Sequence, residues 1–211
     1  MKLFDHNGPL MDALRKLTDL MFCNILFCLL SLPLITAGAA LSALYTCTFA
    51  LVEEREDPFI VRQFWNAFRK NFGQASLLWL LTLLSVGLLG AYYWAVGQLS
   101  EGLMRTYRVT FFVLCVVLLF GFQYIFPLQA RFRMKTGHLL KNAWLLSIAA
   151  LPWTLCSIGV TAGIVYVTLF MNPGFLNMAV FLWAVLLFAI VAYLNSFFFL
   201  AAFKRVKRRE E

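Results

Sequence analysis

The chain has 211 residues, of which 62% are hydrophobic and only 13% charged, and its formal net charge is +8. A soluble domain has roughly 45–50% apolar and about 25% charged residues, so this composition excludes a soluble fold. The basic residues lie in short clusters between long apolar runs, which is the positive-inside pattern of a membrane protein and not the pattern of a nucleic-acid-binding surface. We therefore expect an integral membrane protein whose main partner is the lipid bilayer.

The apolar runs are continuous and lack period-two alternation, so they predict helices and exclude a barrel. A helix needs about 20 apolar residues to cross a bilayer. The sequence thus predicts an all-α, polytopic transmembrane bundle of about six spans in a single membrane domain, residues 1–211. The expected spans are, in chain order, 17–34, a short run ending at residue 52, 76–96, 109–128, 143–170 (bent or entered at Pro152) and 175–203, with a turn at 171–174 between the last two.

The first hairpin, residues 17–52, turns at 33–38 and is open to two interpretations, namely two crossings or a re-entrant hairpin. Both place all but two of the 18 basic residues, Arg105 and Arg108, on one side of the membrane. A single crossing here would break the positive-inside rule. We expect a multi-pass protein of the cell membrane with its N- and C-termini in the cytoplasm. An A-x-A sequence at residues 37–39 follows an apolar stretch too long for a signal peptide, so we expect the segment to be retained.

Residues 57–73 are predicted to form an amphipathic helix in the cytoplasmic interface, with Asp57 as N-cap, Pro58 in the first turn and Gly73 as the stop. Such a helix is either a simple membrane anchor or a docking surface for a cytoplasmic partner. The candidate docking face consists of Phe64, Trp65, Phe68, Arg69 and Lys70. A basic cytoplasmic tail is expected over residues 204–211.

The hydrophobic interiors of the predicted spans contain no Asp, Glu, Lys, Arg or His, which argues against a proton-coupled pump, a voltage sensor or an intramembrane protease. The candidate intramembrane polar residues are Asn24, Thr46, Gln123 and Asn195. Such groups either bond across helices or line a path for an uncharged solute. Two small-residue faces, Gly38-x-x-x-Ser42 and Gly159-x-x-x-Gly163, allow close helix approach within the bundle, against a partner or in self-association.

No set of residues with catalytic, cofactor-binding or metal-binding spacing is apparent. The serines have no neighbouring acid–base pair, the cysteines form no C-x-x-C pair, and there is no phosphate-binding glycine loop. We therefore do not expect an enzyme, and expect no cofactor.

Two blocks resemble a known family. Residues 24–45 contain NIL, then SLPLITAG, then ALY, and residues 64–75 read FWNAFRKNFGQA. Both are similar to the YesL family of bacterial membrane proteins, a domain of unknown function. The resemblance implies an association with carbohydrate uptake of the ATP-binding-cassette (ABC) type, with the transporter's membrane or ATPase subunits as partners.

A Glu-Ala-Ala…Gly coupling loop, typical of importer permeases, is not evident in the chain. The expected function is thus an accessory or regulatory membrane subunit. The alternative is a stand-alone transporter or channel for a small uncharged solute.

Overall fold

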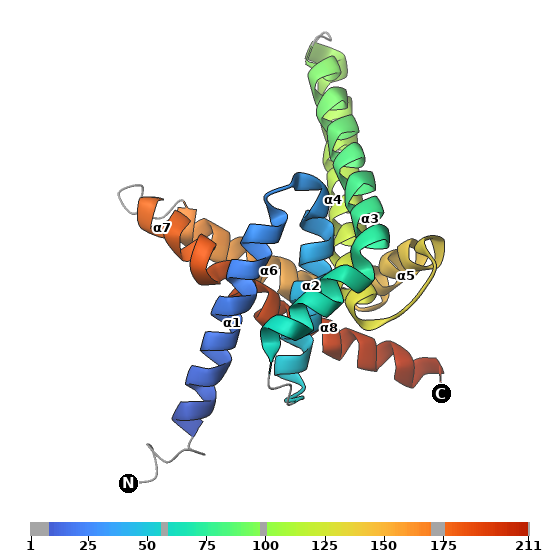
Figure 1. Ribbon diagram of the computed structural model, residues 1–211. Coiled ribbons are helices and arrows are strands. Elements are labelled where there is room, and N and C mark those ends of the chain that lie inside the picture. The colour runs from blue at the N-terminus through green and yellow to red at the C-terminus, as the bar shows by residue number, and fades with distance from the viewer. Residues whose placement is uncertain (1–8, 56–58, 98–100, 170–175, 211) are drawn as a thin grey trace.

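The computed structural model describes residues 9–55, 59–97, 101–169 and 176–210, and these contain helices and short connections but no strand. The predicted all-α fold is confirmed. The elements are α1 (Pro9–Ser31), the 3₁₀ helix η1 (Leu34–Thr36), α2 (Ala37–Val52), α3 (Ile60–Val96), α4 (Glu101–Arg131), α5 (Thr136–Ala149), α6 (Leu151–Leu169), α7 (Leu176–Leu182), the π-helical segment η3 (Trp183–Leu187) and α8 (Phe188–Glu210) (Figure 1). The predicted cap at Asp57, the first-turn Pro58 and the turn at 171–174 lie outside the described residues.

Helix α2 is the centre of the bundle and packs against α1, α3, α4 and α8 (Figure 1). Its close approach to α3 depends on a glycine. A Cβ added at Gly38 would lie 2.6 Å from the Ala75 carbonyl oxygen and 2.6 Å from the Cβ of Trp79. The small-residue face that begins at Gly38 therefore lies inside the bundle, where any larger side chain would push the two helices apart.

Five helical stretches in the described residues are long and apolar enough to cross a membrane, rather than the six expected. They are Leu34–Val52, Ile60–Val96, Thr106–Arg131, Leu151–Thr168 and Asn177–Arg205. Helix α1 differs because its first half carries four charged residues, Asp12, Arg15, Lys16 and Asp19. Its uncharged part runs only from residue 20 to residue 31, about 18 Å of helix against a bilayer core of about 30 Å. Helices α1 and α2 form a hairpin in which α2 alone has the composition of a full span.

The predicted interfacial helix and the third span are one continuous helix, α3, so the prediction that Gly73 ends a helix is wrong. A Cβ added at Gly73 would meet nothing within 4 Å, and helical hydrogen bonding continues through it. Figure 1 shows the helix changing direction between its teal beginning and its green remainder. A glycine followed closely by Ser76 is a common cause of such a bend.

The last two predicted spans are each interrupted. A break at Ala150 (φ −111°, ψ 35°) separates α5 from α6, just before Pro152, which cannot donate a helical hydrogen bond and disfavours helical geometry before it. The final span contains the π-helical turn η3, a geometry that is rare and frequently found at functional sites. Helix α8 continues to Glu210, so the segment predicted as a basic tail is helical as far as that residue.

Helices α3 and α4 form an antiparallel pair that projects beyond the rest of the bundle (Figure 1). Apolar side chains on this pair are widely exposed, among them Leu88 at 63% and Phe112 at 68%. Near its tip, aromatic rings gather around a cavity of about 280 Å³, and they include Tyr92, Tyr93, Trp94, Tyr107 and Phe111. Aromatic belts of this kind lie at the membrane–water interface.

Candidate functional site

Three consecutive charged residues, Glu53, Glu54 and Arg55, follow α2 in a turn of unusual backbone geometry. The Arg55 N–H donates to the Ala50 carbonyl over 3.0 Å, which is the long bond of a Schellman motif. That motif needs a left-handed residue, usually glycine, and here the residue is Glu54 with φ 52°. A left-handed conformation costs a residue with a Cβ roughly 1–2 kcal/mol. The strained turn directs Glu53 and Glu54 toward different partners.

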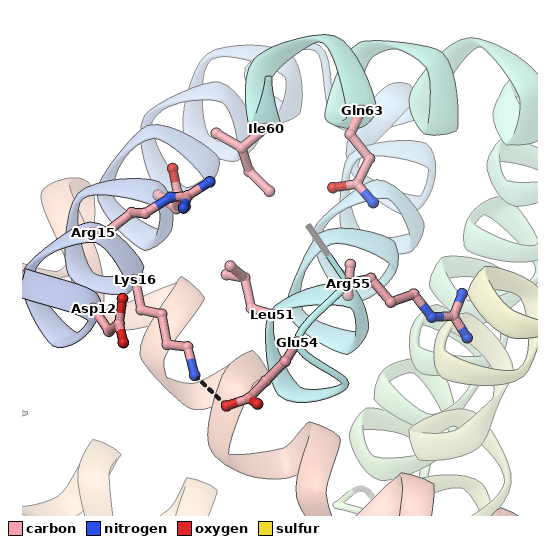
Figure 2. A pocket seen from close by; sticks show the side chains of 10 residues that line it. Asp12, Arg15, Lys16, Leu51, Glu54, Arg55, Ile60 and Gln63 are labelled. Carbon is pink, nitrogen blue, oxygen red and sulfur yellow. Dashed lines mark hydrogen bonds and ion pairs between the residues drawn. The ribbon is translucent and has the colours of Figure 1, made fainter. Parts of the chain in front are cut away.

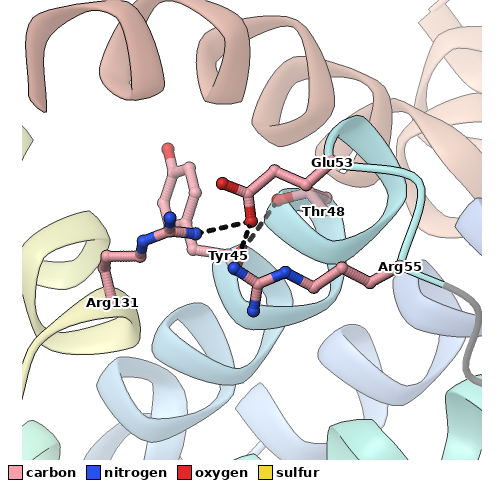
Figure 3. Close-up of polar contacts among 5 residues, drawn as sticks. All are labelled: Tyr45, Thr48, Glu53, Arg55 and Arg131. Carbon is pink, nitrogen blue, oxygen red and sulfur yellow. Dashed lines mark hydrogen bonds and ion pairs between the residues drawn. The ribbon is translucent and has the colours of Figure 1, made fainter. Parts of the chain in front are cut away.

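Glu53 joins α2 to α4. Arg131 Nη1 donates to Glu53 Oε2 over 2.6 Å, and Arg55 Nη2 lies 2.7 Å from the same oxygen. Figure 3 shows both guanidinium groups converging on this carboxylate. The Arg131 hydrogen bond lowers the pKa of Glu53 below its usual value, and the charges of Arg131, Arg55 and Lys204 act in the same direction against the opposing effect of burial. One carboxylate thus neutralises cationic side chains from three segments of the chain.

Glu54 joins the α2 turn to α1. Lys16 Nζ donates to Glu54 Oε1 over 3.0 Å across a cavity of about 200 Å³ (Figure 2). Helices α1 and α3 contribute to the lining with Arg15, Asp19 and Gln63, among others. Burial raises the pKa of Asp19, while the charge of Arg15 opposes that effect.

The chemistry available at this charged end is electrostatic. Acidic and basic side chains both line the cavity, so it does not select strongly for one sign of charge. Within the described residues, no group of three or more His, Cys, Asp or Glu side chains could hold a metal ion. The ion pairs hold α1, α2 and α4 together and bring the basic clusters of separate chain segments to one end of the molecule.

The predicted docking face on α3 is divided by burial. Phe64 and Phe68 are 0% and 7% exposed and belong to the hydrophobic core, so neither presents a surface to a partner. Trp65 is 46% exposed and stacks on Phe68 at a ring-centroid distance of 5.8 Å, and Arg69 and Lys70 are exposed. The prediction of five residues on one docking face is therefore wrong for the two phenylalanines, because that side of the helix packs against the bundle.

Among the predicted intramembrane polar residues, Asn24 has the most developed environment. Its side chain is fully buried and binds the π-helical segment. Its Nδ2 donates to the carbonyls of Trp183 (3.0 Å) and Ala184 (2.7 Å), and its Oδ1 accepts from the Ala189 N–H (2.9 Å). A π-turn disturbs the regular helical hydrogen-bond ladder. One amide of α1 thus bonds three backbone groups in and beside that turn.

The other three candidates do not share a site with Asn24. Asn195 is 4% exposed, accepts from Ser157 Oγ and donates to Thr161 Oγ1, both over 2.9 Å, which joins α8 to α6. Thr46 Oγ1 donates to the Ser42 carbonyl of its own helix over 2.9 Å. Gln123 Oε1 is buried without a hydrogen-bond partner among the described residues. None of these four residues lines any of the cavities of about 200, 280, 500 and 770 Å³ in the described part of the chain.

Two features of the charged end escaped the sequence analysis. The run Glu53-Glu54-Arg55, directly after a span, is a visible signal that the apolar span has ended, but it does not indicate the left-handed turn. Gln129 lies near the end of α4 and is 5% exposed, with neither amide atom hydrogen-bonded among the described residues. No spacing or motif singles out that glutamine in the sequence.

The family comparison falls on the part of the chain where these contacts concentrate. Residues 20–93 match the family described as a protein of unknown function, DUF624. The chain is also 24% identical over 176 residues to the uncharacterized protein YteU of Bacillus subtilis (strain 168). The aligned residues cover 81% of this chain and 78% of that protein. No solved structure matches. The two blocks that resemble the YesL family touch each other where Gly38 packs on Ala75. The predicted resemblance to the YesL-like DUF624 family, whose function is unknown, is therefore confirmed.

Proposed function

We propose that this protein is an accessory or regulatory membrane subunit associated with ABC-type carbohydrate uptake. In this proposal it lies in the bacterial cell membrane, with its charged end and both termini in the cytoplasm. The association with carbohydrate uptake comes from the family resemblance, and the orientation comes from the positive-inside rule.

The observation that carries the accessory role is an open small-residue face on α6. A Cβ added at Gly159 or at Gly163 would meet nothing within 4 Å, and both glycines are exposed. Only 11% of the apolar stretch of α6 is buried inside the protein, against 56% of the apolar stretch of α2. Glycines four residues apart let a second helix approach closely, and such faces drive association in lipid. The α6 face is thus suited to a spanning helix from another subunit.

The alternative of a stand-alone transporter for an uncharged solute has weaker support. It needs polar groups that are free to bind solute along a common path. The amides of Asn24 and Asn195 are instead hydrogen-bonded to the protein itself, and Thr46 is bonded within its own helix.

Affinity purification of the full chain in a mild detergent tests the proposal. We expect membrane or ATPase subunits of an ABC importer to be recovered with the wild-type protein. In a Gly159→Ile/Gly163→Ile variant the recovery should fall at least severalfold, because the branched side chains block close helix approach.

The matched control is Gly87→Ile/Gly90→Ile on α3. Both of these glycines are also open, so the control makes the same chemical change on another apolar helix. Recovery of the chain without any transporter subunit would contradict the proposed function. An equal loss in both double variants would contradict the assignment of α6 as the contact face.

A further inference from the structure

A second pocket at the charged end, of about 770 Å³, is lined by cations and by no acidic side chain among the described residues. It lies between α3, the end of α4 and the start of α5. Lys70 enters from α3, and Arg133 and Lys135 come from the connection between α4 and α5. All three are exposed, and no side-chain hydrogen bond or ion pair joins them to another described residue. This distribution of charge favours an anion, in contrast to the mixed charges around Lys16 and Glu54.

The wall of this pocket, which we call the Gln129 pocket, contains a buried amide without a partner. Gln129 is 5% exposed, and neither its Nε2 nor its Oε1 has a hydrogen-bond partner among the described residues. A buried polar atom left unpaired costs about 1–3 kcal/mol, so such groups in proteins commonly have a ligand or water. Because the amide offers both N–H donors and an acceptor oxygen, it fits a ligand that carries both an acceptor oxygen and a hydroxyl.

The N-terminus of α5 also faces this pocket, since Lys135 and Thr136 belong to its lining. The N-cap residue Lys135 makes no side-chain capping hydrogen bond, and the first turn has no acidic residue. The first backbone N–H groups of a helix lack partners and attract anions. A Cβ added at Gly137 would meet nothing within 4 Å, so space remains beside these N–H groups. Cations, helix end and buried amide all favour the same kind of ligand.

The α4–α5 connection that supplies the cations is held against α3. Gln74 Nε2 donates to the Met134 carbonyl over 2.8 Å, which fixes the connection in place. Phe132 and Met134 also line a neighbouring, more apolar cavity of about 500 Å³, together with Leu145 and Phe203. The side chains of Glu53, Arg131 and Lys204 belong to its lining as well. The cationic pocket and this more apolar cavity thus share one wall, as a ligand with a charged head and an acyl chain requires.

We propose that the Gln129 pocket binds the head group of an anionic phospholipid that carries a hydroxyl, as phosphatidylglycerol does. The phosphate lies among Lys70, Arg133, Lys135 and the α5 N-terminus, the head-group hydroxyl bonds Gln129, and an acyl chain occupies the cavity beyond Phe132. Basic pockets between membrane helices are established sites for such head groups in general.

Native mass spectrometry of the full-length protein in detergent, with defined added lipids, tests the charge requirement. We expect phosphatidylglycerol to bind and phosphatidylcholine to bind far more weakly. Arg133→Gln/Lys135→Gln should weaken phosphatidylglycerol binding about 25-fold, at about fivefold per charge. The control Arg62→Gln/Arg205→Gln removes the same charge outside the pocket and should change binding less than twofold. Equal weakening by both pairs, or equal binding of both lipids, would overturn the proposal.

Phosphatidylmethanol, which has the same charge but no head-group hydroxyl, tests the role of Gln129. The wild type should prefer phosphatidylglycerol over phosphatidylmethanol roughly fivefold, the worth of one net hydrogen bond. Gln129→Leu should abolish that preference while still selecting anionic lipids. An unchanged preference would refute the assignment of Gln129, and the exposed Arg133/Lys135 pair keeps the site testable if Gln129→Leu does not fold. If soluble glycerol 3-phosphate displaced phosphatidylglycerol at equal concentration, the ligand would be a free phosphate and the lipid assignment would be wrong.

Discussion

Asn24 shows how one side chain can compensate for an irregular helix inside an apolar bundle. A π-turn leaves backbone groups without their usual partners, and in lipid no water is present to bond them. The Asn24 amide bonds two carbonyls and one N–H of the 183–189 segment. The sequence predicts Asn24 to be a polar residue within a span but does not indicate its target, because nothing in residues 183–187, all of them apolar, predicts a π-turn.

Replacing Asn24 should destabilise the protein more than replacing another polar residue of the same bundle. Asn24→Leu leaves three backbone groups without that amide, and we expect a loss of about 1–3 kcal/mol in the free energy of unfolding. Thr46→Val removes only a bond within its own helix and should change stability by less than about 0.5 kcal/mol. Thermal unfolding in detergent measures both variants, and equal effects would contradict the role given to Asn24.

Glu53 should make stability depend on pH in the acid range. Its pKa is lowered in the folded protein from the ordinary value of 4.5. A depressed carboxyl pKa contributes stability that is complete above the unfolded value and is lost as the pH falls through the lower folded value. Unfolding temperatures between pH 7 and pH 3 should therefore fall on acidification. Glu53→Gln and Arg131→Gln should each flatten that fall, and an unchanged pH profile in both variants would be the contrary result.

At the scale of elements, the end of α2 combines a strained residue with an exposed ion pair. Glu54 adopts a left-handed conformation that suits glycine. Its pair with Lys16 is largely exposed, at 77% for the Glu54 side chain and 36% for that of Lys16, and exposed pairs contribute about 0–1 kcal/mol. The turn thus retains a glutamate where the backbone favours glycine.

Glu54→Gly should raise the unfolding temperature by a few degrees or leave it unchanged, because relief of the backbone strain offsets the lost ion pair. Glu54→Ala removes the same ion pair but keeps a Cβ, so it should not stabilise the protein. Thermal unfolding of the two variants side by side measures the difference. A lower unfolding temperature for the glycine variant than for the alanine variant would show that the turn is not strained.

The sequence predicts where most helices lie but not where they are continuous. Proline signalled the break before α6 because its missing N–H is a local property of one residue. Gly73 signalled a stop that the structure lacks, since an exposed glycine costs a helix only about 1 kcal/mol and packing on both sides compensates for that. The burial of Phe64 and Phe68 could not be predicted either, because the sequence pattern of an amphipathic face is the same whether that face contacts lipid, a partner or its own bundle.

At the scale of the whole molecule, the basic clusters and the aromatic tip lie at opposite ends. Arg55, Arg131 and Lys204 gather around Glu53, although they come from three distant segments. The tip of α3 and α4 carries Tyr93 and Trp94 with few charges nearby. This separation follows from the charge pattern that the sequence displays. The four charges in the first half of α1 leave an apolar stretch that is too short for a full span.

Membrane-impermeant maleimide labelling tests this arrangement in intact cells. In a background without the native cysteines, Gly97→Cys at the tip should be labelled from outside. Lys141→Cys at the basic end should be labelled only after the membrane is permeabilised, because positive segments stay on the cytoplasmic side. Labelling of both positions from the same side would contradict the proposed topology.

The bond between Asn24 and Ala184 also constrains the order in which the protein can be made. The two residues are 160 positions apart, so the first helix enters the membrane long before its partner is synthesised. At about 5–20 residues per second, roughly 10–30 seconds pass between the two. During that interval the Asn24 amide lacks the backbone groups of residues 183–189 that it bonds in the folded protein. The hairpin that the family comparison covers is thus completed only after the segment that contains Ala184 has been synthesised.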